Sequence, residues 1–363
     1  MPRAARLSIA LILAIGCSAL LAVGQLRLGS RTRVLDWHAC FCDAGGDDSY
    51  LFIKGFIIWL QAMAILVGAM IGRLAVPSSQ SSGRAATTVA LTVAASVGAL
   101  AGVPAAVREV MMAQPARYAP PNVTMVREAA ITGVVLGIVA ALGALRSVPA
   151  LAGAALSWAW LWLVGLASTS RSGGHTAALG MLYGYPREGP GAFLADIIPL
   201  AVMAVITAGT AWWGAHRGGL RLRAMFAAML GPTLVFATYL SAGKPIEHTE
   251  GLRNAITLML MGMMAAAGGA AAGALRSPRR HGALDALIII LAIAGILSTA
   301  ALSFEPLVNG PFSFISPVAG TLLVAALFTL PILPAVTDTE IDSRREQIAY
   351  SPYPEADLEK STD

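Results

Sequence analysis

Charged residues are scarce in this sequence: they make up 12% of its 363 residues, whereas soluble domains carry about 25%. Hydrophobic residues reach 56%, and the mean hydropathy is +0.70. These values exclude a soluble globular protein. Apolar runs of roughly 20 residues, the length that crosses about 30 Å of hydrocarbon as a helix, recur along the sequence. The chain is therefore predicted to be an all-α, polytopic transmembrane helix bundle.

Recognisable catalytic motifs are lacking as well. The sequence contains no dinucleotide-binding glycine fingerprint, no Walker A motif, no HExxH and no nucleophile elbow. An enzyme is accordingly the less favoured class. Lysine is also rare, with only Lys54, Lys244 and Lys360 among 25 basic residues. Arginine-rich chains filled with Ala, Gly, Val and Leu are typical of GC-rich bacterial genomes, so we expect a protein of the bacterial plasma membrane.

Apolar stretches bounded by charged residues or by Pro, Gly and Ser define the predicted spans. They lie at about 7–26, 51–72, 87–106, 128–145, 148–168, 193–215, 224–242, 255–275, 285–303 and 315–335, which makes about ten spans within a transmembrane domain of residues 1–335. Residues 336–363 form an acidic tail with eight acids against three bases, a composition that predicts disorder. Its Tyr350-Ser-Pro-Tyr353-Pro stretch is a candidate docking segment for a cytoplasmic partner, and a merely solvated tail is the favoured interpretation.

Arginine residues mark one side of the membrane. Alternate short connections contain a single acid, Asp285, and nine arginines: Arg73, Arg84, Arg146, Arg217, Arg221, Arg223, Arg276, Arg279 and Arg280. The positive-inside rule places these connections and both termini in the cytoplasm. Topology and anionic lipid heads account for the basic residues, so the net charge of +5 gives no reason to invoke nucleic acid.

Two stretches of the sequence resemble each other. Residues 127–132 (Arg-Glu-Ala-Ala-Ile-Thr) lead into a span that ends Gly-Ala-Leu-Arg, and residues 253–257 (Arg-Asn-Ala-Ile-Thr) lead into a span with the same ending. This similarity predicts four repeated helical hairpins, with one further span at each end. The alternative is chance resemblance among Ala- and Gly-rich helices.

Glycines spaced four residues apart occur in several of the predicted spans. Such GxxxG pairs allow helices to approach closely in lipid, where no hydrophobic force drives their association. We expect them at the packed centre of the bundle and at contacts with protein partners in the membrane. The pairs are Gly68/Gly72, Gly98/Gly102, Gly133/Gly137 and Gly269/Gly273.

The spans at 193–215 and 224–242 contain the most irregular membrane sequence. A proline within a span removes one backbone hydrogen bond and clashes with the preceding turn, and the freed carbonyl groups can line a polar cavity. The predicted pathway for a solute comprises Asp196, Pro199, Gly231, Pro232, Thr233, Thr238 and Tyr239. A simple packing kink is the alternative interpretation.

The first outer loop contains His38, Cys40 and Cys42 within five residues. Imidazole and thiolate groups are ligands for copper and zinc, so a metal site is one interpretation of this cluster. Cys40 and Cys42 are too close in sequence for an unstrained disulfide with each other. Free thiols and a strained or intermolecular disulfide are therefore the other interpretations. No other cofactor is predicted.

Trp158 and Trp162 share one face of the span at 148–168 and lie near its middle, away from the interfaces where Trp is enriched. This face can line an apolar groove for a lipid or another subunit, although core packing is the default interpretation.

Transport is the leading functional hypothesis. In it the chain is a permease-like component that moves a small or amphipathic solute past the spans at 193–215 and 224–242, as part of a complex. A non-catalytic membrane subunit or scaffold is the alternative. A membrane enzyme acting on lipid-linked substrates at the outer face is the second alternative. In each case the lipid bilayer surrounds the protein.

Overall fold

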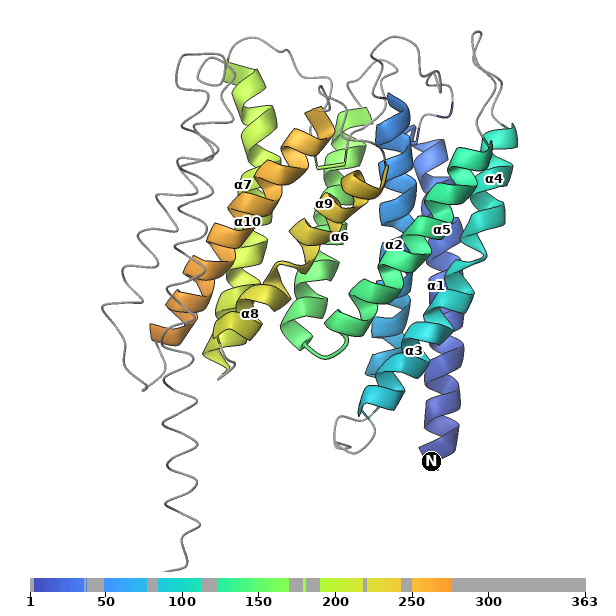
Figure 1. The fold of residues 1–363 in the computed structure, drawn as a ribbon, viewed down its shortest axis with the longest axis horizontal. Coiled ribbons are helices and arrows are strands. Elements are labelled where there is room, and N and C mark those ends of the chain that lie inside the picture. Colours follow the sequence, from blue (N-terminus) through green and yellow to red (C-terminus); the bar gives the residue numbers. More distant parts are fainter. Residues whose placement is uncertain are drawn as a thin grey trace, which may run out of the picture.

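The computed structural model describes residues 3–35, 37, 49–76, 84–112, 123–169, 179–180, 190–217, 221–242 and 250–275. Within these ranges all regular secondary structure is helical (Figure 1). The helices are α1 (Arg3–Arg31), α2 (Ser49–Leu74), α3 (Arg84–Ala99), α4 (Gly102–Met112), α5 (Val123–Ala144), α6 (Val148–Thr169), α7 (Pro190–His216), α8 (Arg221–Ala228), α9 (Leu230–Ala242) and α10 (Glu250–Leu275).

The helices have the length and composition of membrane spans. Seven segments of the described chain are apolar and long enough to cross a bilayer, and α8 with α9 forms one more if the bent pair counts as a single span. The predicted helical membrane bundle is thereby confirmed for the described residues. The predicted spans at 285–303 and 315–335 and the tail at 336–363 lie outside them.

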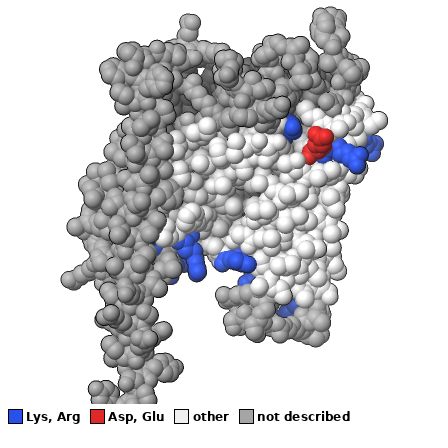
Figure 2. Space-filling view, viewed as in Figure 1, with Lys and Arg blue, Asp and Glu red and all other residues white. Residues whose placement is uncertain are grey.

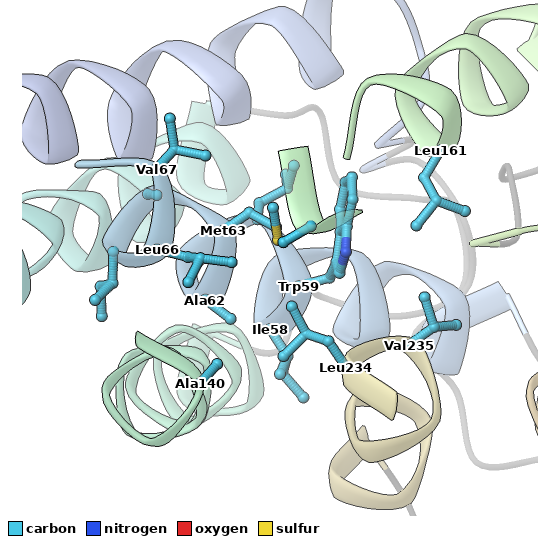
Figure 3. Close-up of a cluster of buried hydrophobic side chains, with 14 of the residues drawn as sticks. Ile58, Trp59, Ala62, Met63, Leu66, Val67, Ala140, Leu161, Leu234 and Val235 are labelled. Atoms are coloured by element: carbon cyan, nitrogen blue, oxygen red, sulfur yellow. The ribbon is translucent and has the colours of Figure 1, made fainter. Parts of the chain in front are cut away.

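Helix α2 occupies the centre of the bundle. Its apolar window is 89% buried, the largest share among the candidate spans of the described chain, and a helix that is apolar on all sides is suited to such a position. Figure 3 shows its side chains, including Trp59, Met63 and Leu66, beside residues of α5, α6 and α9. Helices α1 and α3 pack against it from another side.

At the predicted glycine pairs, the backbones of neighbouring helices approach each other closely. On α5, a Cβ added to Gly137 would lie 2.8 Å from Ala62 Cα of α2. On α10, a Cβ added to Gly273 would meet the carbonyl oxygen of Trp212 on α7 at 2.5 Å. The other predicted glycines also abut residues of this chain: Gly68, Gly72 and Gly98 face α1, Gly102 faces Gln61 of α2, Gly133 faces α2 and Gly269 faces α7.

Two of the membrane segments are broken near a proline. Helix α3 ends and α4 begins just before Pro104. This break was not predicted within the span at 87–106. Helices α8 and α9 meet at Met229, ahead of Pro232, with a bend of 48°. Proline lacks a backbone N–H and clashes with the carbonyl group four residues earlier. In both segments the preceding helix ends close to that residue.

Charged side chains lie at the two ends of the bundle. In Figure 2, Lys and Arg line the lower edge of the described surface, whereas Lys, Arg and an acidic group lie together near its upper right edge. An ion pair of 3.9 Å between Arg27 Nε and Glu109 Oε1 links α1 to α4. Between these two ends, the described surface in this view carries no charged side chains.

Candidate functional site

Residues Leu179 and Gly180, in the connection between α6 and α7, lie buried within the helix bundle. Their carbonyl groups accept hydrogen bonds from two other helices. The hydroxyl of Tyr239 on α9 donates to Leu179 O at 3.2 Å, and Asn254 Nδ2 on α10 donates to Gly180 O at 3.1 Å. Buried backbone carbonyl groups need hydrogen-bond donors of this kind, and here the donors come from the last turn of α9 and the second turn of α10.

The position of Gly180 shows how far this dipeptide enters the bundle. A Cβ added there would lie 3.6 Å from Leu161 Cδ2, and Leu161 is on α6 about 12 Å from the end of that helix, at 1.5 Å per residue. The residue has a φ of +83°, a conformation that glycine adopts without strain. Glycine at this position therefore lets the chain turn between α6, α9 and α10.

The break between α8 and α9 lies between α6 and α10. A Cβ added to Gly231 would collide with the Oγ of Ser157 on α6. On the other side, a Cβ added to Gly262 of α10 would lie 2.8 Å from the Cγ atom of Pro232. The broken turn thus fits between α6 and α10 only because two contacting residues have no side chain.

The structure brings together some of the residues predicted for the pathway. Gly231, Pro232 and Tyr239 face α6, α10 and the buried dipeptide. Thr238 is buried close by, and its hydroxyl donates to Leu234 O of its own helix at 2.7 Å. Thr233, in contrast, is exposed on the surface of α9.

The remaining two predicted pathway residues are on α7. Pro199 is buried, and its carbonyl oxygen accepts a hydrogen bond of 3.2 Å from Trp160 Nε1 on α6. This bond ties α7 to α6. Asp196 belongs to α7 as well, and its side chain lies outside the described residues.

Two polar residues that were not predicted as site residues are also buried or hydrogen-bonded in the bundle. Asn254 was noted only as part of the repeated stretch at 253–257, and no sequence pattern predicted the burial of Leu179 and Gly180. Gln61 is fully buried on α2, and neither its Oε1 nor its Nε2 has a partner among the described residues. Its amide abuts Gly102 at the break between α3 and α4. A single Gln within an apolar span is the sequence feature that could have marked Gln61 as a buried polar residue.

The predicted metal ligands His38, Cys40 and Cys42 lie outside the described residues. Within the described ranges, no group of three or more His, Cys, Asp or Glu side chains is placed to hold a metal ion. Cys17 has a free thiol on α1.

Comparison with known proteins adds no relative. No protein family, curated protein or solved structure matches this chain.

Proposed function

We propose that this chain is a membrane transport protein, or a permease-like component of a transport complex, with a solute pathway between α6, α9 and α10. The observation that carries the proposal is the buried dipeptide Leu179-Gly180 beside the broken span of α8 and α9. Loops that re-enter the membrane and helices that break within it are features of channels and transporters.

The chemistry of this region suits a gate. Leu179 and Gly180 are held by one hydrogen bond each, from Tyr239 and Asn254. Two single bonds from neutral groups, each with a net worth of about 1 kcal/mol, hold a short segment without fixing it permanently. Release of this dipeptide would open a route from the connection between α6 and α7 towards the break at Met229.

The scaffold alternative is weakened by the glycine contacts. The predicted GxxxG pairs pack against α1, α2 and α7 of this same chain, so a partner in the membrane would have to use other surfaces. We retain such partners, and a cytoplasmic partner for residues 336–363, as parts of the proposed transport complex.

The finer topology is also part of the proposal. It comprises ten spans, both termini in the cytoplasm of a bacterium, and hairpins that derive from a repeated unit. Lys and Arg lie at both edges of the bundle, and the lower edge, where this view shows no Asp or Glu, is the one that the proposal assigns to the cytoplasm (Figure 2). The repeat is supported by the pairing of α2 with α5 and of α7 with α10, each through a glycine pair.

Access of water to α9 tests the proposal. In a background where Cys17, Cys40 and Cys42 are replaced by serine, Thr238→Cys is treated with a charged, membrane-impermeant thiosulfonate in reconstituted vesicles. Thr238 is 0% exposed, so a thiol there reacts only if the pathway opens to water. The matched control is Leu240→Cys, on the same helix and 51% exposed towards lipid.

We expect Thr238→Cys to react and Leu240→Cys to stay unmodified, because the charged reagent does not enter hydrocarbon. Adding Tyr239→Phe should raise the rate at Thr238→Cys, since that variant loses one of the two bonds that hold the dipeptide. A Thr238→Cys thiol that is no more reactive than Leu240→Cys, with and without Tyr239→Phe, would contradict the transport proposal and favour a scaffold.

A further inference from the structure

An apolar groove runs along the outside of the bundle between α1 and α6. Its volume is about 310 Å³. It is lined by Leu20, Leu21, Gly24, Gln25 and Leu28 of α1 and by Trp158, Ala159, Trp162 and Leu166 of α6. Leu20 is 74% exposed, so the groove opens sideways to the surroundings of the helices, which in this protein are lipid chains.

Gln25 is the polar side chain in this apolar lining. Its Oε1 accepts hydrogen bonds from Trp158 Nε1 at 3.0 Å and from Trp162 Nε1 at 3.2 Å. These two bonds fix the orientation of the amide. Its Nε2 is buried and has no hydrogen-bond partner among the described residues. The whole residue is only 5% exposed. An unpaired buried donor is costly, so this nitrogen is suited to an acceptor that arrives with a ligand.

The shape of the groove selects the kind of ligand. One turn of a helix with its side chains, about 10 Å across and 5.4 Å long, has a volume of roughly 420 Å³, which exceeds the groove volume of about 310 Å³. A single alkyl chain needs less room and matches the Leu, Ala and indole walls. A carbonyl oxygen at the head of such a chain would supply the acceptor that Gln25 Nε2 lacks.

A cationic side chain stands at the end of the groove. Gly24, Leu28 and Arg31 are spaced four and three residues apart on α1, so they lie on one face of the helix. Arg31 is exposed in the last turn of α1, whereas Arg27 pairs with Glu109. A guanidinium group is well suited to bind phosphate.

We propose that this groove binds one glycerophospholipid. Its acyl chain lies between α1 and α6, an ester carbonyl oxygen accepts a hydrogen bond from Gln25 Nε2, and the phosphate lies near Arg31. This site is on a different side of α6 from the proposed solute pathway and does not depend on it. The bound lipid would form part of the helix packing between α1 and α6.

Photo-crosslinking tests the site. The full chain is reconstituted with phosphatidylcholine that carries a diazirine in one acyl chain, and labelled peptides are identified by mass spectrometry. Gly24→Leu fills the groove, and nothing lies within 4 Å of the Cβ it would add, so the variant should fold. Gly143→Leu is the matched control, because Gly143 has equally open surroundings on α5.

We expect labelling to concentrate on the groove residues of α1 and α6, to fall several-fold in Gly24→Leu and to be unchanged in Gly143→Leu. Uniform labelling of all lipid-facing helices, or equal labelling of the two leucine variants, would overturn the proposal. So would a groove filled by a second protein chain, which would yield protein cross-links from a photoreactive residue at Leu20 and no lipid adduct.

The hydrogen bond to Gln25 has its own test. An ether analogue of phosphatidylcholine lacks the ester carbonyl groups, so the protein should retain the ester lipid about threefold to tenfold better, the worth of one hydrogen bond. Gln25→Met should abolish this preference, because it removes the donor. Gly24→Leu should still lower the labelling by the photoreactive lipid, because it blocks the acyl chain and not the carbonyl group. Equal retention of ester and ether lipid by the unmodified protein would contradict the assigned role of Gln25.

Discussion

Replacement of Gly137 by alanine probes the contact between α5 and the central helix α2. The Cβ that alanine adds would lie 2.8 Å from Ala62 Cα, 2.9 Å from Ala62 O and 2.9 Å from Ile65 Cδ1. Non-bonded carbon atoms prefer separations of about 3.5–4.0 Å. Two of these three neighbours are backbone atoms that cannot turn away, so the two helices must separate. Overpacking of this kind costs roughly 1–3 kcal/mol.

Gly143 provides a control on the same helix, because nothing lies within 4 Å of a Cβ added there. Alanine favours the helix over glycine by about 0.8–1.0 kcal/mol, and this gain is common to both variants. The difference between them therefore isolates the steric term. We predict that Gly137→Ala has a free energy of unfolding lower than that of Gly143→Ala by roughly 1–3 kcal/mol.

The assay is unfolding of the purified protein in mixed micelles by increasing mole fractions of sodium dodecyl sulfate, followed by tryptophan fluorescence. Gly143→Ala should be at least as stable as the unmodified protein. Equal free energies of unfolding for the two alanine variants would refute the close backbone contact between α2 and α5.

Three further outcomes are expected. Tyr239→Phe leaves the carbonyl group of Leu179 without its donor, which should cost about 1–3 kcal/mol and accelerate backbone hydrogen exchange just after Leu179; unchanged exchange would show that the bond is unimportant. An impermeant maleimide should modify Arg221→Cys only after the membrane is opened, and modification in intact cells would reverse the proposed orientation. If the first outer loop binds copper or zinc, near-stoichiometric metal should disappear when Cys40 and Cys42 are both replaced by serine, whereas metal-free unmodified protein would exclude that site.

The helical membrane bundle could be predicted because it depends on local sequence. A run of apolar residues long enough to cross lipid must satisfy its backbone within one helix. The bend beside Pro232 followed from a local rule as well, because proline disrupts the preceding turn in any surrounding. The same rule applies to Pro104, but there the long uninterrupted hydropathy of the span concealed the break.

The arrangement of the site depended on contacts that no local pattern contains. The burial of Leu179 and Gly180 arises from donors on α9 and α10, which are distant in sequence. Likewise, the shared face of Trp158 and Trp162 indicated a groove, but its partner Gln25 lies on α1. Helix spacing shows which residues share a face and does not show which helix that face meets.

Backbone hydrogen exchange in lipid nanodiscs tests whether the broken span of α8 and α9 is a hydrated pathway. We predict that amides around Met229 exchange much faster than those around Gly137, which lie in the unbroken helix α5. Pro232→Ala should slow the exchange around Met229, because alanine restores the backbone donor that proline lacks. Equal and strong protection of both segments in the unmodified protein would contradict a hydrated pathway at this break.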